Sequence, residues 1–250
     1  MTNGPKVVLS IAGYDPSSGA GITADVKTAA AHGCFAVTCI SAMTIQSTQG
    51  VRGIEPVPDE VIRRTLQELN DDFEIAAVRI GMLGWAAQVV ADFLESAKLP
   101  HVVLDPVIKS SSGASLIDAT GLHTLRSRLL PLSTVVTPNV DEAVELTGVS
   151  DRQEAARVLH EMGGGSVVIT GGHLTEAVDL LYVDGRIEEL RAPKIKSRST
   201  HGTGCAFATS LACGLANGGT VREAAVEAKA FVRLSIESAP HVGKGTGPVL

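Results

Sequence analysis

Aromatic side chains are scarce in this chain of 250 residues, at 3% with a single Trp. The core must therefore be filled mainly by Val, Leu, Ile and Ala, which provide most of the 44% of hydrophobic residues. Positive charge is also in the minority, because 21 Lys and Arg stand against 27 Asp and Glu, for a net charge of −6. A nucleic-acid or membrane-surface binder needs a concentrated positive field, so neither partner is expected.

Long apolar runs and closely spaced cysteines are missing as well. No run approaches the ~18 residues that span a bilayer, and the apolar stretch at residues 7–12 is too short for the core of a signal peptide. The cysteines form no C-x-x-C pair and have no nearby pair of histidines, which argues against a structural zinc site. A cytoplasmic protein with reduced thiols is therefore expected.

Short β-branched runs alternate with helical stretches along most of the sequence. Strands are predicted at residues 6–12, 35–40, 76–80, 101–104, 134–137 and 166–170, and helices at 22–32, 58–70, 86–97, 119–130, 140–146 and 152–162. This alternation predicts a mostly parallel sheet that is covered by helices on both faces.

The last third of the sequence departs from this alternation. Two strand-like runs, at residues 177–183 and 186–190, are joined by Asp184-Gly185 and predict a small antiparallel hairpin at the sheet edge. Two helices follow, at about residues 203–216 and 220–238. Since no linker or repeat divides the sequence, one doubly wound α/β domain over residues 1–250 is expected.

Small and polar residues follow the predicted strands. In doubly wound folds ligands bind beyond the carboxyl ends of the strands, so these segments are candidates for the site. The segments lie at residues 13–21, 42–46, 81–83, 105–107, 138–142, 171–173 and 201–205, and they include His173 and His201.

The sequence Gly202-Thr-Gly-Cys205 stands at the head of an Ala-rich helix. Its glycines allow successive N–H groups to point the same way, and the helix adds its positive dipole end, so the segment suits a phosphoryl group. Alternatively, the glycines only start a helix that packs tightly on the sheet. Cys205, in the first helical turn, is predicted to have a lowered thiol pKa, or else to be a small buried side chain.

Two acidic residues, Asp105 and Glu142, follow predicted strands. Two carboxylates at a sheet rim can hold Mg²⁺ directly or through water. They can equally be charges near helix N-termini that the helix dipole stabilises.

The segment Gly13-Tyr-Asp-Pro-Ser-Ser-Gly-Ala-Gly-Ile-Thr-Ala-Asp25 resembles the opening signature of the hydroxymethylpyrimidine and phosphomethylpyrimidine kinases of thiamine biosynthesis, which have the ribokinase-like fold. The resemblance covers essentially the whole chain. It continues through Gln46-Ser-Thr-Gln-Gly50, Ile80-Gly-Met-Leu83, Val103-Leu-Asp-Pro-Val107, Leu129-Leu-Pro131, Thr137-Pro-Asn-Val-Asp-Glu142, Gly171-Gly-His-Leu174, Thr200-His-Gly-Thr-Gly-Cys205 and Val242-Gly-Lys-Gly-Thr-Gly-Pro248.

The resemblance implies a reaction and its site. ATP with Mg²⁺ would phosphorylate 4-amino-5-hydroxymethyl-2-methylpyrimidine, and many relatives then phosphorylate the monophosphate; the family is also commonly dimeric. Gln46 would hydrogen-bond the aminopyrimidine edge, because an amide offers both a donor and an acceptor. The implied roles of the other residues are ring packing by Met82 and Val107, pocket lining by Gly13, Ala20 and Asp25, nucleotide contacts by Asn139, Thr170, Gly172 and Thr203, Mg²⁺ contacts by Asp105 and Glu142, and an anion hole at Gly202, Gly204 and Cys205.

Three positions depart from the family pattern. Cys205 stands where sugar kinases of this fold have an Asp base, although pyrimidine and pyridoxal kinases share the Cys. Thr170 stands where many relatives have Lys. The loop at residues 109–113 lacks the usual Lys or Thr before Ser-Gly, which bears on contacts to a substrate phosphate.

Three other functions remain open at the level of the sequence. A pyridoxal kinase of the same subfamily would share the anion hole and Cys205. A Cys-dependent acyltransferase would use His201 as base, and a ligand-binding protein would catalyse nothing.

Overall fold

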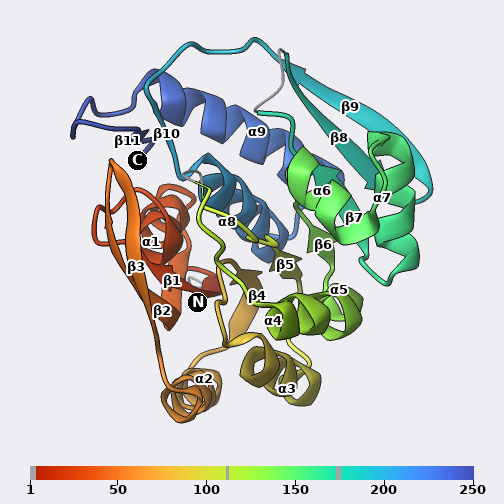
Figure 1. Cartoon of the computed structure of the whole chain (residues 1–250). Coiled ribbons are helices and arrows are strands. Elements are labelled where there is room, and N and C mark those ends of the chain that lie inside the picture. Colours follow the sequence, from red (N-terminus) through yellow and green to blue (C-terminus); the bar gives the residue numbers. More distant parts are fainter. Residues whose placement is uncertain (1–3, 111–112, 173–175) are drawn as a thin grey trace.

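The computed structural model describes residues 4–110, 113–172 and 176–250 (Figure 1). Its centre is a nine-stranded sheet in the order β3-β2-β1-β4-β5-β6-β7-β8-β9. The pairs from β2 through β1, β4, β5 and β6 to β7 are parallel, while β3, β8 and β9 join antiparallel. The strands are β1 (Val7–Tyr14), β2 (Phe35–Ser47), β3 (Gly50–Pro56), β4 (Ile75–Ile80), β5 (Val102–Leu104), β6 (Val135–Val136), β7 (Ser166–Ile169), β8 (Ala177–Val183) and β9 (Arg186–Ala192).

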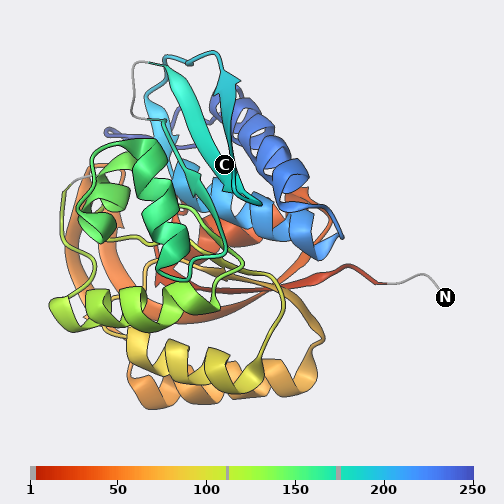
Figure 2. The same cartoon turned by 90° about the vertical axis from the view of Figure 1, so that its right-hand side faces the viewer.

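Helices cover both faces of this sheet, and Figure 2 shows α2 and α3 on the opposite side of the strands from α8 and α9. Alternate strand residues feed two cores: Leu9 and Ile11 of β1 pack on one face, and Val8 packs on the other. The helices are α1 (Gly21–Ala31), α2 (Asp59–Asp72), α3 (Ala87–Ala97), α4 (Ala119–Thr124), which continues through a π-helical turn η1 (Leu125–Leu129) into α5 (Leu130–Leu132), α6 (Val140–Thr147), α7 (Arg152–Glu161), α8 (Thr203–Ala216) and α9 (Val221–Glu237).

Helix α8 matters most for the site, because it carries the Gly-Thr-Gly-Cys segment at its first turn. Its residues from Ala206 to Ala216 are all buried, and its many Ala side chains let it lie close to the sheet. Among the described residues no helix is both long and apolar enough to cross a membrane.

The predicted fold class is confirmed: the sheet is mostly parallel, has helices on both faces and carries an antiparallel hairpin, β8–β9, at one edge. A second antiparallel hairpin was not predicted. Strand β2 runs on to Ser47 and turns back through β3, so the opposite edge is antiparallel as well (Figure 1). A short parallel pair, β10 (Ser199–His201) with β11 (Gly247–Pro248), adds a two-stranded sheet near the start of α8.

Candidate active site

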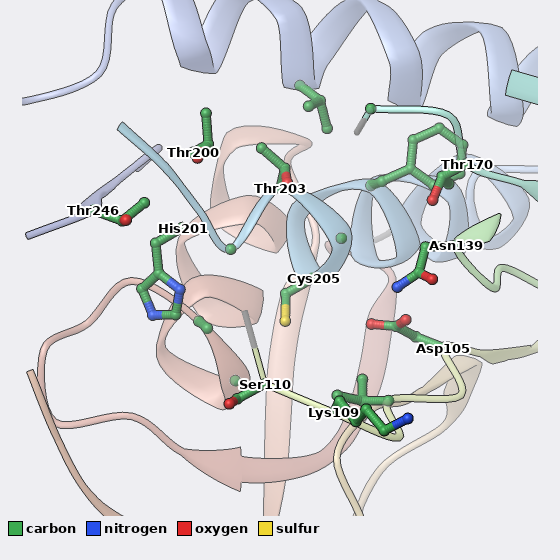
Figure 3. Close-up of a pocket in the computed structure, with 18 of the residues that line it drawn as sticks. Asp105, Lys109, Ser110, Asn139, Thr170, Thr200, His201, Thr203, Cys205 and Thr246 are labelled. Atoms are coloured by element: carbon green, nitrogen blue, oxygen red, sulfur yellow. The ribbon is translucent and has the colours of Figure 1, made fainter. Parts of the chain in front are cut away.

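A cleft of about 1350 Å³ runs along the edge where the parallel strands end (Figure 3). Its walls come from β1, β2, the segments after β4 to β7, the hairpin β8–β9, and the helices α8 and α9. This volume exceeds the ~300–1,000 Å³ of a typical single-ligand pocket, so the cleft has room for two ligands side by side.

Nearly all of the residues expected at the site line this one cleft. They are Gly13, Ala20, Gln46, Met82 and Val107, then Asp105, Asn139, Glu142, Thr170 and Gly172, and finally Gly202, Thr203, Gly204 and Cys205. Residues from both ends of the chain therefore meet at one edge of the sheet, as the rule for doubly wound folds requires. His173 and residues 111–112 of the loop at 109–113 lie outside the described residues.

Asp25 does not line the cleft, and this expectation is corrected. Its carboxylate is fully buried beneath the cleft, where it accepts hydrogen bonds from Ser10 Oγ at 2.6 Å and Thr209 Oγ1 at 2.7 Å. It also lies 3.1 Å from a guanidinium nitrogen of Arg79. Burial raises the pKa of Asp25 despite the opposing effect of Arg79. The Asp25 side chain therefore supports the site from the protein interior and is not positioned to contact a ligand in the cleft.

Arg79 is a fully buried cation that links two of the carboxylates. Its second terminal nitrogen lies 2.7 Å from Asp105 Oδ2. Strand periodicity puts residues 79 and 81 on one face, and a Cβ at Gly81 would stand only 1.8 Å from an Arg79 nitrogen. Gly81 therefore leaves the space through which the Arg79 side chain reaches toward the cleft.

The turn before α8 has the form expected of an anion hole. Gly202, the residue before the helix, has φ +88°, and a Cβ there would stand 1.8 Å from Gly19 O. The first intrahelical bond runs from Ala206 N to Gly202 O at 2.9 Å, so the N–H groups of residues 203–205 precede it and point out of the helix end. Nothing lies within 4 Å of a Cβ built on Gly204. Free N–H groups, a helix dipole and open space together suit a phosphoryl group.

The expected thiolate character of Cys205 is wrong. Burial of the sulfur raises the pKa of Cys205 to about 11, although the Arg79 cation and the N–H of Gly21 act in the opposite direction. Desolvation therefore outweighs the helix dipole, and the group is a neutral thiol at neutral pH.

Asp105 and Glu142 face the cleft as neighbours. Burial first, and then the repulsion from nearby carboxylates, raise the pKa of Glu142 to about 8; burial and the neighbouring Asp25 raise that of Asp105 to about 6, against the pull of Arg79. Glu142 also closes a capping box at the start of α6, where its Oε2 accepts from Asn139 N at 2.9 Å and Asn139 Oδ1 accepts from Glu142 N at 2.9 Å. Glu142 is therefore both a capping residue at the start of α6 and a residue that lines the cleft.

These two carboxylates fit a magnesium ion. Mg²⁺ is bound through one or two carboxylates, several waters and substrate phosphates rather than by an all-protein cage. Within the described part of the chain no group of three or more His, Cys, Asp or Glu is placed to hold a metal. Burial and repulsion from neighbouring carboxylates disfavour negative charge on both side chains, and a divalent cation beside them would favour their charged forms.

One wall of the cleft holds a polar cluster that sequence reasoning found only in part. Gln46 Nε2 lies 3.1 Å from His201 Nε2, and the same ring nitrogen lies 2.8 Å from Asp15 Oδ2. Asp15 was missed, although Asp followed by Pro-Ser-Ser is a common signal for a side chain that bonds its own turn. Its oxygens accept from the backbone N–H groups of Ser17 and Ala20 at 2.8 and 2.9 Å.

The opposite end of the cleft is polar and cationic. Asn139 and Thr170 sit on adjacent segments, where Thr170 N donates to Pro138 O at 2.9 Å (Figure 3). Lys229 of α9 reaches this wall and lies 2.8 Å from Asp179 Oδ2. Sequence reasoning missed Lys229, because a Lys in mid-helix looks like a solvated side chain. Other Lys and Arg side chains that line the cleft are Lys109, Lys194, Lys196, Arg198 and Arg233.

A mostly parallel sheet with helices on both faces, and a large cleft beyond the ends of its strands, fit a small-molecule kinase of the ribokinase-like class. The sequence profile of the family described as phosphomethylpyrimidine kinase matches residues 15–250. The chain belongs to this family, as its motifs indicated.

Individual relatives agree with this assignment. The hydroxymethylpyrimidine/phosphomethylpyrimidine kinase of Haemophilus influenzae is 40% identical over 97% of this chain and 95% of its own. Among solved structures, the pyridoxal kinase of Bacillus subtilis in its ADP complex superposes with a TM-score of 0.89 at 33% identity, over 98% of this chain and 96% of that one. The phosphomethylpyrimidine kinase of Clostridium difficile gives 0.81 at 31% identity, over 92% and 99%. The predicted enzyme class, an ATP-dependent kinase, is confirmed.

Proposed function

We propose that this protein transfers the γ-phosphoryl group of ATP to the hydroxymethyl group of 4-amino-5-hydroxymethyl-2-methylpyrimidine. A second transfer, to the resulting monophosphate, gives the diphosphate for thiamine biosynthesis. The observation that carries the proposal is the arrangement of the cleft. Gln46 lies beside His201 on one wall, Asn139 and Thr170 lie on the other side, and the helix start with Thr203 and Cys205 lies between them (Figure 3). The names of the relatives point to the same class of substrate.

The pyrimidine ring is assigned to the end of the cleft near Gln46. The amide offers an acceptor for the ring's amino group and a donor for the adjacent ring nitrogen. Met82 and Val107 belong to a small apolar cluster on this wall and pack against the ring. Gly13 leaves room for the Met82 side chain, since a Cβ on Gly13 would stand 2.9 Å from Met82 Sδ. Ala20 adds only a small side chain to the pocket lining.

The nucleotide is assigned to the cationic end, with Asn139, Thr170, Gly172 and Thr203 as contacts. Since Thr170 replaces the Lys of many relatives, Lys229, which lines the cleft beside Asp179, supplies positive charge in its place. Asp105 and Glu142 are the residues that would hold Mg²⁺. When bound, the ion would neutralise negative charge on the phosphates.

The N–H groups of residues 203–205, which include Gly204 and Cys205 and follow the turn at Gly202, are assigned to the transferring phosphoryl group. A loose phosphoryl-transfer transition state needs positioning and charge stabilisation more than a strong base. Cys205, as a neutral thiol, then shapes the anion hole, and its Sγ does not remove the substrate proton before transfer. This assignment accounts for a Cys at the position where sugar kinases of this fold use Asp.

The assembly and the cellular location are also part of the proposal. Residues 1–250 act as one kinase unit, and two copies form a homodimer. Support comes from Met43 and Ile45, which lie on the same face of the β2–β3 hairpin with 51% and 59% of their surfaces exposed. The four free cysteines and the use of ATP favour the cytoplasm. Light scattering on the protein and on an Ile45→Asp variant tests the dimer, because the variant is expected to be monomeric.

The alternative functions differ in how well they fit the site. A pyridoxal kinase would use the same anion hole, and the close superposition with the pyridoxal kinase of Bacillus subtilis makes this the main alternative function. Gln46 favours the pyrimidine, because a primary amide matches an amino group beside a ring nitrogen. Acyl transfer is disfavoured, since the His201 ring bonds Asp15 and Gln46 rather than the Cys205 sulfur.

An assay of ADP release, with the pyrimidine alcohol and its monophosphate supplied as separate substrates, tests the proposal. Turnover of both substrates is expected. Turnover of the alcohol alone would remove the second transfer, and turnover of neither would refute the proposed function.

A further inference from the structure

The imidazole of His201 lies between the Asp15 carboxylate and the Gln46 amide. Its Nε2 is 2.8 Å from Asp15 Oδ2 and 3.1 Å from Gln46 Nε2. Both contacts use one ring nitrogen, which can either donate a single hydrogen or accept through a single lone pair. The partner that fixes this choice therefore also constrains the other contact.

Asp15 fixes the choice, because it can only accept. Its buried carboxylate already takes hydrogen bonds from Ser17 N at 2.8 Å, Ser17 Oγ at 2.7 Å, Ala20 N at 2.9 Å and Gly19 N at 3.2 Å. Although burial raises the pKa of Asp15, the hydrogen bonds from His201 and Ser17 lower it below its ordinary value. A carboxylate surrounded by donors requires that His201 Nε2 carry the hydrogen.

The ring has little freedom to avoid this arrangement. A Cβ on Gly19 would stand 2.3 Å from His201 Cδ2, so the imidazole lies directly against the backbone of the loop. On the other side of the residue, Val249 N donates to His201 O at 3.2 Å. The loop near the N-terminus therefore contacts the ring of His201, and the C-terminal segment holds its backbone.

Gln46 cannot then present its NH₂ group to His201, because a donor would face a donor. Its other terminal atom, Oε1, lies 3.1 Å from Thr44 Oγ1, and that hydroxyl also lies 3.0 Å from Tyr14 O. A hydroxyl has one hydrogen, and Tyr14 O can only accept. A half-turn of the Gln46 amide places Oε1 beside the His201 N–H, whose one hydrogen is then shared between Asp15 and Gln46. The same half-turn places Nε2 on the Thr44 oxygen, so that no donor faces a donor.

We propose that Asp15 and His201 are positioning residues that hold the Gln46 amide with its oxygen toward the imidazole and so select the substrate ring. The inference rests on the proposed function, in which Gln46 meets the ring edge. An amide of fixed polarity offers its acceptor and its donor to the substrate in a fixed order. A 4-aminopyrimidine, with an N–H donor beside an acceptor nitrogen, matches one order, whereas a pyrimidin-4-one presents the reverse order.

Selectivity between these two rings measures the effect. The wild-type protein and two variants, His201→Met and His201→Gln, are assayed with 4-amino-5-hydroxymethyl-2-methylpyrimidine and with its 4-oxo analogue. Met removes the donor, which frees the amide to rotate. The ratio of kcat/KM for the amino substrate to kcat/KM for the oxo analogue is therefore expected to fall about tenfold or more. Gln carries an NH₂ group that can donate to both Asp15 and Gln46, so the wild-type ratio is expected to return. Equal losses on both substrates in His201→Met, with the ratio unchanged, would overturn the proposal.

A second measurement keeps the inference separate from the proposed activity. Nitrogen-15 NMR of the ligand-free wild-type protein, with the His201 signals assigned by their loss in a variant, reports which ring nitrogen carries hydrogen. A protonated Nε2 is expected, whether the ring is neutral or charged. An Nε2 without hydrogen would refute the positioning role even in an active kinase. A protonated Nε2 in a protein that phosphorylates no pyrimidine would refute the proposed function alone.

Discussion

Replacing Gly202 by Ala is the sharpest single perturbation of the anion hole. The residue has φ +88°, and its new Cβ would stand 1.8 Å from the backbone oxygen of Gly19. The positive φ alone costs about 1–2 kcal/mol for a residue with a Cβ. Because a backbone atom cannot swing aside like a side-chain end, the turn must also move and take the N–H groups of residues 203–205 with it.

Gly218→Ala is a matched control for this variant. Gly218 has φ +89° at the other end of α8, and nothing lies within 4 Å of a Cβ built there. It therefore carries the same conformational cost without the collision, and it does not line the cleft. For a chain of this size that cost lowers Tm by about 2–8 °C.

Thermal unfolding and steady-state ADP release separate the two effects. Both variants are expected to lose Tm, but Gly202→Ala is expected to lose kcat by about a hundredfold or more, the size that follows the loss of one oxyanion donor. Gly218→Ala is expected to keep the wild-type kcat. If Gly202→Ala matched its control in kcat, the assignment of this turn to the transferring phosphoryl group would be wrong.

Three other substitutions probe the rest of the site. Gln46→Ala is expected to lower kcat/KM for the aminopyrimidine by about 5- to 150-fold, from ~1–3 kcal/mol for unpaired polar groups, and an unchanged KM would contradict its role. Cys205→Ser is expected to keep substantial kcat, and mass spectrometry is expected to show slow alkylation of Cys205 that speeds up as pH approaches its pKa of about 11; complete loss of kcat in this variant would make the thiol the base. Glu142→Gln is expected to lose kcat severely and to need more Mg²⁺, whereas activity that keeps the wild-type Mg²⁺ dependence would separate this residue from the ion. Because folding raises the pKa of Glu142 from 4.5 to about 8, the stability that its protonation supplies is full below pH 4.5 and is lost as pH rises through about 8, so Tm of the ligand-free protein should fall less across this window in Glu142→Gln than in wild type.

Local patterns were enough to predict most of the fold. Strands of a parallel sheet that is buried on both faces are typically continuous apolar runs rich in Val and Ile, and β5 and β7 are recognisable from such runs alone. Helix starts carry their own signals, as in the capping box between Thr220 and Glu223 that opens α9. The β2–β3 hairpin was missed because Gly50 and Gly53 weaken the strand pattern and Met43 and Ile45 point outward.

The sequence was enough to predict which residues form the site, but much less so their burial and their pKa values. Strand ends and glycines placed nearly every candidate in one cleft, because these features depend on local sequence. The buried state of Asp25 depends instead on Arg79, which looks like an ordinary strand residue until the fold surrounds it with carboxylates. The high pKa of Cys205 comes from burial of its thiol, which outweighs the opposing effect of the Arg79 cation. Partners such as Asp15 and His201, 186 residues apart, meet only in the folded chain.

The ratio of kcat/KM for 4-amino-5-hydroxymethyl-2-methylpyrimidine to that for pyridoxal, measured with saturating ATP and Mg²⁺, tests the central claim most directly. The polarity of the Gln46 amide and the apolar wall formed by Met82 and Val107 predict a clear preference for the pyrimidine over pyridoxal. Equal or better turnover of pyridoxal would contradict the account and identify the cleft as that of a pyridoxal kinase.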